Sequence, residues 1–315
     1  MRSAAVLSLL LLAAPARAKA PYGILLLAHG GDASWNKEVE DLRVRVNAKV
    51  PTETALGMAD PKSLQAAVDR LEKRKVARIV AVPLFVQSRS EVLDQTAYAL
   101  GLSDTPSEAL RAGLERMAKA HGAHAAHGAH AAPAHGHSME FSTERVKARR
   151  PIALARALDD HELVGRILNA RAKALSRDPA RERVVLVAHG PVDEAALESW
   201  RGSMRSLCGA LKSFRSCGYG LLRDDAAPAI RAAAVAEIRA MVAGAKGEKS
   251  RALVLPVLIA RGGIERKIVK DLAGLDYAWS GETLMPHDGF DAWVLERAAD
   301  AERAGRGGLT GARAN

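Results

Sequence analysis

The sequence predicts an α/β protein built of two homologous lobes, each with a parallel sheet, that face a central cleft. Short apolar runs of strand length alternate with segments whose apolar residues recur at helical spacing. The same order of segments occurs twice along the 315 residues. Because strands that alternate with helices form parallel sheets covered on both faces, each repeat is expected to form one such lobe.

The first half is expected to span residues 19–178. Its opening apolar run GILLLA, at residues 23–28, is typical of a buried parallel strand. Pro61 suits the first turn of a helix, because a proline there loses no helical hydrogen bond. We expect strands at residues 23–28, 52–58, 77–85 and 152–158, and helices that begin near residues 35, 61, 91 and 161.

The second half, residues 179–305, repeats these landmarks. Its first strand ends in AHG as in the first half, Pro228 opens a helix as Pro61 does, and Pro256 matches Pro83 in the third strand. We expect strands at residues 183–188, 218–222 and 253–259, and helices that begin near residues 192 and 228 and after His287.

Residues 1–18 have the features of a secretory signal peptide. Arg2 precedes an apolar run, and Ala16-Arg17-Ala18 places small residues where a signal peptidase cleaves. The alternative is an uncleaved anchor, but the run is shorter than the roughly 20 residues that a membrane span needs. We therefore expect a periplasmic or secreted protein with no stable membrane span after processing.

Composition excludes several classes of protein. With 48% hydrophobic and 26% charged residues, the chain is neither wholly disordered nor a polytopic membrane protein. The net charge is +10, but aromatic residues make up only 4%, which argues against a base-stacking surface for nucleic acid. The sequence lacks the phosphate-binding GxxxxGK[ST] and GxGxxG motifs, so no nucleotide cofactor is expected.

Two cysteines cannot form a disulfide framework or a four-thiolate metal site. In an oxidising compartment Cys208 and Cys217 could join in one disulfide, and a buried reduced pair fits the sequence equally well.

A low-complexity insertion at residues 119–139 interrupts the first half. Six histidines stand there among alanine and glycine, and their imidazoles could bind Zn²⁺, Ni²⁺, Co²⁺ or Cu²⁺. We favour a metal store or delivery tether that feeds the cleft over an exposed linker that binds metal adventitiously. The histidines are His121, His124, His127, His130, His135 and His137. Residues 306–315, rich in Gly, Ala and Arg, are expected to be a flexible tail.

The two AHG turns carry the strongest functional signal. His29 and His189 each follow a predicted buried strand, at the carboxyl end where open α/β sheets place their ligands. A neutral imidazole there can accept a proton or bind a metal ion. The alternative is that each histidine only caps or packs. The recurrence of AHG at equivalent positions of the two halves makes this alternative less favourable.

These motifs together resemble the sirohydrochlorin cobaltochelatases and ferrochelatases of the CbiX type, which are class II chelatases. The resemblance rests on LLLAHGG (25–31), GMADPKSLQAAVDRL (57–71) and RIVAVPLFV (78–86), echoed by VVLVAHG (184–190), GLLRDDAAP (220–228) and ALVLPVLIARGG (252–263). It implies the chelatase-like fold, with a macrocycle in the cleft between the lobes. It also implies ATP-independent insertion of a divalent metal, Co²⁺ or Fe²⁺ and in principle Ni²⁺, into sirohydrochlorin or a related tetrapyrrole.

The resemblance also assigns roles to residues. His29 is implied as the principal base or ligand, and His189 as a second site or a degenerate copy of it. Glu91 stands where family members carry a second metal-binding histidine, and a carboxylate can still bind metal and take a proton. Glu265 is its counterpart if one residue is skipped. A second departure is Gly31, with Pro191 in the other half, where the family has a small polar residue.

Sirohydrochlorin carries many carboxylates, so a basic rim is expected to hold this anionic tetrapyrrole. Arg89, Arg261, Arg266 and Lys267 lie beside the implied site, although each could also be a solvated surface charge. His161, like His287, precedes a predicted helix and is expected to cap it or to contact the ligand.

A rival function uses the same scaffold without turnover. The exported protein would then bind and deliver metal ions or a tetrapyrrole. The replacement of the second family histidine by Glu91 and the signal peptide both favour this alternative.

Overall fold

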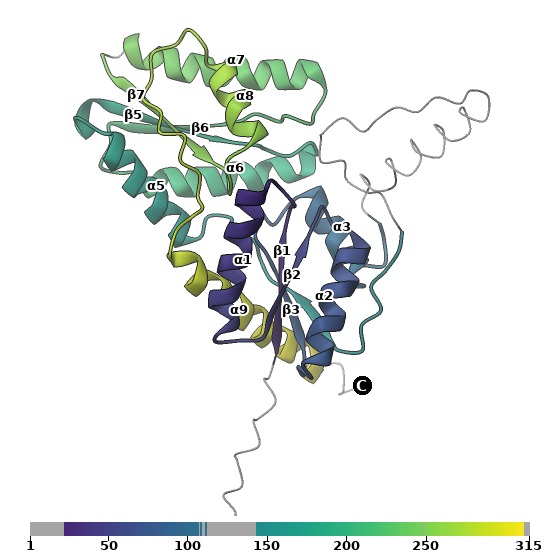
Figure 1. Ribbon diagram of the computed structural model, residues 1–315. Coiled ribbons are helices and arrows are strands. Elements are labelled where there is room, and N and C mark those ends of the chain that lie inside the picture. Colours follow the sequence, from purple (N-terminus) through teal and green to yellow (C-terminus); the bar gives the residue numbers. More distant parts are fainter. Residues whose placement is uncertain (1–21, 107, 109–110, 112–142, 248, 312–315) are drawn as a thin grey trace, which may run out of the picture.

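The computed structural model describes residues 22–106, 108, 111, 143–247 and 249–311. The predicted signal peptide at 1–18 and the histidine-rich insertion at 119–139 lie outside the described residues. Two lobes are visible in Figure 1, one above the other. No helix in the described part of the chain is both long enough and apolar enough to pass through a bilayer.

The first lobe contains a parallel four-stranded sheet in the order β2-β1-β3-β4. Successive side chains of β1 point to opposite faces: Ile24 packs with the apolar side of α1, and Leu25 with that of α2. The elements are β1 (Gly23–Ala28), α1 (Ala33–Asn47), β2 (Thr52–Leu56), α2 (Pro61–Lys73), β3 (Ile79–Pro83), α3 (Glu91–Ala99) and β4 (Ile152–Leu154). The predicted strands of the first half are thus confirmed, with shorter ends.

The second lobe repeats the plan with a parallel three-stranded sheet in the order β6-β5-β7. In place of a fourth strand, Ala278 forms a single parallel bridge with Leu253 of β7. The elements are the 3-10 turn η2 (Pro179–Arg181), β5 (Glu182–Ala188), α6 (Glu194–Gly209), β6 (Ser216–Leu221), α7 (Pro228–Gly247), β7 (Arg251–Val257) and α8 (Gly263–Asp271). The predicted α/β class and parallel sheets are confirmed.

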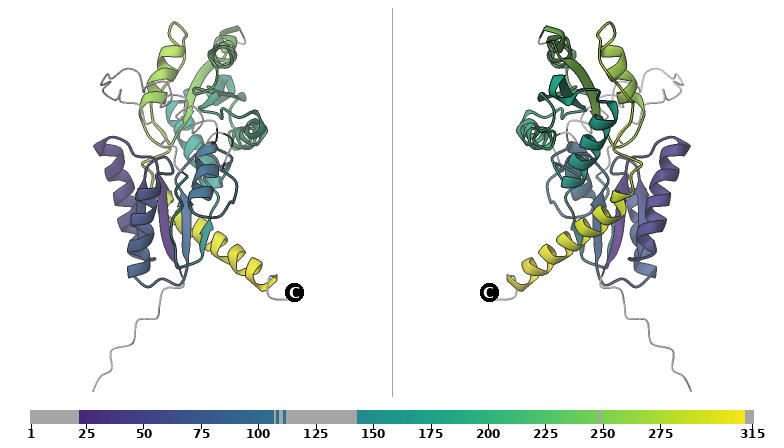
Figure 2. Two further views of the ribbon diagram at one scale, coloured as in Figure 1. Left: turned by 90° about the vertical axis from the view of Figure 1, so that its right-hand side faces the viewer. Right: turned by 90° about the vertical axis from the view of Figure 1, so that its left-hand side faces the viewer.

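The last helix of each half packs against the other lobe. Helix α5 (Glu162–Leu175) contacts β7 and α6, whereas α9 (Gly289–Gly311) returns to contact β3, β4 and α1. Figure 2 shows α9 crossing the first lobe on its way to the C-terminus. Arg45 of α1 donates to both carboxylate oxygens of Asp291, each at 3.0 Å. The sequence repeat divides at residue 178, but the lobes in space do not follow this boundary. Helix α5 of the first half packs against the second lobe, and α9 of the second half packs against the first lobe.

This exchange produces one apolar core that runs through both lobes. It joins one face of the first sheet, under α1 and α9, to one face of the second, under α5 and α6. Two smaller clusters cover the outer faces of the sheets. Because the shared core is continuous, the lobes are expected to unfold together.

Two details of the structure bear on expectations from the sequence: one is corrected and the other is settled. Helix α9 continues to Gly311, so the flexible tail expected from residue 306 is helical over most of its length. Residues 312–315 lie outside the described part. Cys208 at the end of α6 and Cys217 in β6 form a disulfide, which decides between the two alternatives that the sequence left open.

Glu182, the first residue of β5, predicts how stability depends on pH. Burial alone would raise the pKa of this carboxyl, but hydrogen bonds from Ser176, from the Arg177 amide at 2.9 Å and from Arg251 at 3.1 Å outweigh it and lower the pKa. A carboxyl whose pKa is lower in the folded state stabilises the fold above its unfolded pKa, and the contribution is lost as pH falls through the folded pKa. Acid unfolding should therefore begin below about pH 4, the ordinary range of Glu.

The variant Glu182→Gln should lose about 1–3 kcal/mol of unfolding free energy at pH 7 and show a flatter decline with acid. Urea unfolding measured at several pH values tests both points. Glu237→Gln, at an exposed position of α7, is the control. An unchanged acid profile in Glu182→Gln would contradict the expectation.

Candidate functional site

Both AHG turns lie where the sequence predicts them, at the carboxyl ends of the central strands β1 and β5. The ring Nδ1 of each histidine faces the carbonyl of the following glycine, at 3.2 Å for His29 and 2.8 Å for His189. Each ring is partly exposed. The two histidines therefore make the same contact with the next glycine, but only Gly190 has a positive φ, of 78°. The turns also differ in what surrounds the imidazole.

Aromatic side chains surround His29. Its ring stacks on Trp35 of α1 with centroids 5.2 Å apart, and Phe85 approaches edge-on at 6.4 Å. The Trp35 indole Nε1 donates to the His29 carbonyl at 2.7 Å. A Cβ at residue 31 would lie 2.5 Å from Trp35 Cδ1, so only glycine fits there. Trp35 thus accounts for Gly31, the departure from the family's small polar residue.

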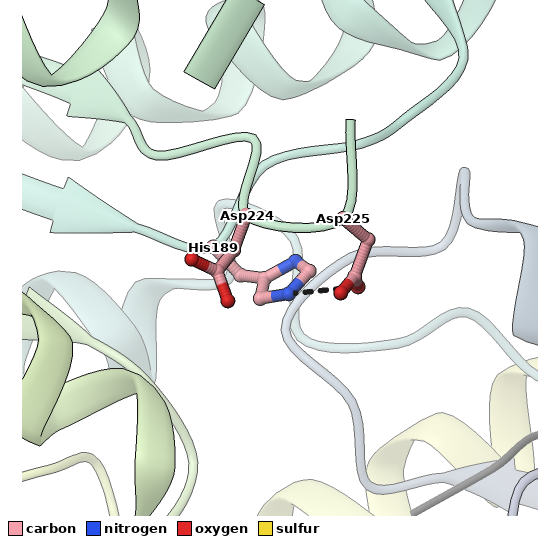
Figure 3. A group of neighbouring side chains, drawn as sticks. All are labelled: His189, Asp224 and Asp225. Atoms are coloured by element: carbon pink, nitrogen blue, oxygen red, sulfur yellow. Dashed lines mark ion pairs between the residues drawn. The ribbon is translucent and has the colours of Figure 1, made fainter. Parts of the chain in front are cut away.

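Acidic side chains surround His189. Its Nε2 lies 3.2 Å from Asp225 Oδ2, and the dashed line in Figure 3 marks this ion pair. Burial alone would lower the pKa of the imidazole, but the hydrogen bond to Asp225, the charges of Asp225 and Asp224 and the Gly190 carbonyl together outweigh it and raise the pKa. With Nδ1 directed at the Gly190 carbonyl, the protonated ring has an acceptor on both sides.

Asp224 completes a group of three potential metal ligands with His189 and Asp225, whose ligand atoms all lie within 4.8 Å of one another. However, Asp224 is already engaged, because Arg231 Nε donates to it at 2.8 Å and Lys267 forms a second ion pair. Two cations beside one carboxylate oppose the approach of a third. His189 and Asp225 are therefore the donors with the greater freedom to bind a metal ion.

Glu91, from the first lobe, reaches this end of the second lobe. It is the first residue of α3, and its Oε1 accepts from the Asp193 amide at 3.2 Å. Burial raises the pKa of the Glu91 carboxyl, and the nearby charges that act on it include those of Asp193, Asp225 and His189. The sequence prediction paired Glu91 with His29; the contacts described for its carboxylate connect it to the second lobe.

The segment that leads from β3 into α3 crosses between the lobes. Gln87 Nε2 donates to Ser203 Oγ of α6 at 2.9 Å, and Trp200 Nε1 donates to the Arg89 carbonyl at 2.9 Å. Together with the bond from Asp193 to Glu91, these contacts tie one loop of the first lobe to α6 and its N-terminal end. The position of Glu91 thus depends on how the lobes pack.

A buried carboxylate anchors this crossing segment within the first lobe. Asp159, whose side chain is 1% exposed, accepts from both the amide and the hydroxyl of Ser88 at 2.7 Å. Ser88 Oγ in turn accepts from the Ala157 amide at 2.9 Å. Asp159 is therefore a positioning residue for the segment that carries Glu91.

Asp159→Ala should lower the free energy of unfolding by about 2–3 kcal/mol, because the amide and hydroxyl of Ser88 lose a buried acceptor. The neighbouring exposed residue offers a matched control, and Asp160→Ala should change stability by less than about 0.5 kcal/mol. Chemical denaturation measures both. Equal effects of the two variants would show that the Ser88 contacts contribute little.

The other predicted residues lie in different settings. The Lys267 side chain is ion-paired with Asp224, so its charge is compensated. Arg89, Arg261 and Arg266 are exposed, as expected for a basic rim. Glu265 lies in the first turn of α8, and a Cβ on Gly281 would be 3.0 Å from its Oε1. The contact of any of these residues with a substrate stays a prediction.

His161 and His287 are caps. His161 Nδ1 accepts from the Leu163 amide at 3.2 Å at the start of α5, and His287 Nδ1 accepts from the Gly289 amide at 3.0 Å at the start of α9. The capping interpretation of both residues is confirmed.

Sequence analysis missed the two aspartates beside His189. The signal was present, because Asp224 and Asp225 come shortly after the second strand of the repeat, within RDDAAP. Strand β6 pairs with β5 in parallel, so its carboxyl end lies beside that of β5. Reading both strand ends together would have placed an acid pair next to His189.

Comparisons with known proteins agree with this architecture. Residues 23–92 match the CbiX family, and no curated protein matches the chain. The fold is similar to that of SirB from Bacillus subtilis with Fe³⁺, at 15% identity and a TM-score of 0.56, over 91% of this chain and 97% of that one. The sirohydrochlorin chelatase SirB of Bacillus subtilis subspecies spizizenii, in complex with cobalt, gives 14% identity and a TM-score of 0.51 over the same shares.

A third similar structure is DR2241 from Deinococcus radiodurans, a multi-domain protein with structural similarity to chelatases. It is 18% identical with a TM-score of 0.51, over 89% of this chain and 55% of that one. Identities this low show a shared fold and no more. The first lobe is thus similar in sequence to the CbiX family over residues 23–92, and the whole described chain has a chelatase-like fold.

Proposed function

We propose that the protein inserts a divalent metal ion, Co²⁺ or Fe²⁺, into sirohydrochlorin or a related anionic tetrapyrrole without ATP. We further propose that it handles the metal at the His189 end of the second lobe. The observation that carries the second proposal is the convergence of His189, Asp225 and Glu91, which come from both lobes. The CbiX match and the SirB fold support the reaction class.

The chemistry required is an exchange of one metal ion for two protons. The ion enters the ring as two pyrrole N–H groups lose their protons, so the protein must hold a cation and then accept protons. His189 can do either at Nε2: the lone pair binds the metal when the ring is neutral, and it binds a proton otherwise. Asp225, already 3.2 Å away, supplies a carboxylate oxygen next to it.

Glu91 suits the proton-accepting part of this exchange. Because burial raises the pKa of its carboxyl, the group takes up a proton more readily than an exposed glutamate. The same carboxylate can ligate a divalent ion, and so its replacement of the family histidine is compatible with turnover.

Export to the periplasm or the medium is a separate proposal. The features of residues 1–18 support it, and so does the Cys208–Cys217 disulfide, since disulfides persist mainly in oxidising compartments. Cell fractionation followed by mass spectrometry of the mature N-terminus tests it, and an intact residue 1 in the cytoplasmic fraction would contradict it.

The rival is a carrier that binds metal or tetrapyrrole without turnover. The six histidines of the insertion favour it, because a low-complexity sequence rich in histidine is typical of metal binding. One assay separates the two functions. The purified mature protein is mixed with sirohydrochlorin and Co²⁺, and the visible spectrum is followed for insertion above the uncatalysed rate.

Multiple turnovers that persist when residues 119–139 are deleted support the enzyme. Stoichiometric metal binding that disappears with the deletion, with no rate enhancement, supports the carrier and excludes the enzyme.

A further inference from the structure

A second candidate site lies at the end of the second sheet opposite His189. There a cavity of about 380 Å³ opens where β5 and β7 begin, which is within the range of small-ligand sites. It is lined by residues of the α5–β5 connection, the end of α7, the start of β7 and the loop after α8. The acidic residues among them are Asp178, Glu182 and Asp276.

The lining is positively charged. Five of its side chains are cationic and three are acidic. The one buried acid, Glu182, is already compensated by Arg251 at 3.1 Å and by further hydrogen bonds. The other four cations form no ion pair among the described residues; they are Arg177, Arg181, Lys246 and Lys249. The open part of the cavity thus carries more positive than negative charge.

Local structure holds two of the lining residues in unfavourable states. Lys249 has a φ of 55°, in the left-handed region that a lysine rarely adopts. The turn is fixed by the Lys249 amide, which donates to the Lys246 carbonyl at 3.1 Å, and by the Ser250 amide, which donates to the Ala245 carbonyl at 2.8 Å. The Ser250 hydroxyl oxygen is buried and has no hydrogen-bond partner. An oxyanion in the cavity would supply a hydrogen-bond acceptor for the Ser250 hydroxyl.

We propose that this cavity binds a small polyanion, one that carries two or more phosphate or carboxylate groups. Several cations that converge on one opening favour multiply charged anions over single ones, and they disfavour metal ions. The cavity lies at the amino ends of the strands, whereas His189 follows the carboxyl end of β5. Occupation of the cavity is therefore independent of the metal-handling site.

Isothermal titration calorimetry with the full mature chain at 0.15 M salt tests this. Pyrophosphate and citrate are the two probes, one for phosphate groups and one for carboxylates. We expect saturable 1:1 binding of at least one probe. Arg181→Glu and Lys249→Glu should each weaken it by about tenfold or more, because each replaces an attraction by a repulsion.

The matched control is Lys212→Glu, which changes the net charge of the chain equally at an exposed position outside the cavity. It should change the affinity less than about twofold, since distant exposed charges are screened at this ionic strength. His189→Ala should leave the affinity unchanged. Equal weakening by all three charge reversals, or no saturable binding of either probe to the folded wild type, would overturn the proposal.

Discussion

Replacing His189 by alanine is expected to lower the rate of metal insertion by at least about 100-fold and to abolish saturable Co²⁺ binding at this end of the second lobe. The physical reason is that the imidazole supplies the nitrogen ligand in a group otherwise made of carboxylates. Asp225 would keep its place after β6 but lose its partner at 3.2 Å. The visible-spectrum assay measures the rate. Calorimetry with Co²⁺ measures binding, and both use the protein with residues 119–139 deleted so that the histidine-rich insertion does not contribute.

His29→Ala is the matched comparison, because it makes the same chemical change at the equivalent turn of the first lobe. His29 packs between Trp35 and Phe85, so its loss removes aromatic contacts, and we expect a smaller effect on insertion than that of His189→Ala. A circular dichroism melt of each variant establishes that it is folded. If His29→Ala abolishes insertion while His189→Ala retains it, the metal is handled in the first lobe and our assignment is wrong.

The same pair of variants tests the role of the lobes separately from the reaction itself. Loss of turnover in only one variant identifies the working lobe. Full turnover in both would show that neither imidazole is a ligand or base, whatever the reaction.

Phe290→Ala should lower the free energy of unfolding by about 3–5 kcal/mol, the largest stability effect that we expect from a single substitution. Phe290 is fully buried in the first turns of α9 and packs edge-on to Trp293 at 5.8 Å. A Cβ added at Gly289 would lie 2.5 Å from Leu163 Cδ1 of α5, so the two exchanged helices meet closely at this point. Truncation of Phe290 would therefore leave a cavity in the core that the lobes share.

Urea unfolding followed by circular dichroism measures this loss. Leu102→Ala is the control, since Leu102 is 42% exposed and its truncation should cost less than about 0.5 kcal/mol. Should Phe290→Ala cost no more than the control, the exchanged helix would contribute little to the stability of the lobes.

The strands and their order along the chain were predictable because their signal is local. A continuous apolar run such as residues 23–28 can be satisfied only by burial on both faces, and a parallel strand between two layers of helices provides it. The repeat then predicted two sheets from one pattern. The AHG histidines were placed correctly for the same reason, since a residue that follows a buried strand must lie at the edge of its sheet.

The partners of those histidines were not predictable in this way. Trp35 reaches His29 from the next helix, and its bulk accounts for Gly31. Asp225 reaches His189 from the loop after a neighbouring strand, and Glu91 extends toward it from the other lobe. Each of these contacts joins residues on different elements. The two strand ends together could have placed Asp225 near His189, but spacing along the chain gave no sign of the contacts that Trp35 and Glu91 make.

The sequence by itself therefore determined the α/β class, the two repeated lobes and the strand ends at which chemistry can occur. The tertiary structure decided that the two halves exchange helices α5 and α9, and it decided that carboxylates lie beside His189 while aromatic rings surround His29. The physical reason is that hydrophobic periodicity along the chain indicates which side of a helix or strand is buried. The residues that this side contacts depend on how whole elements pack together.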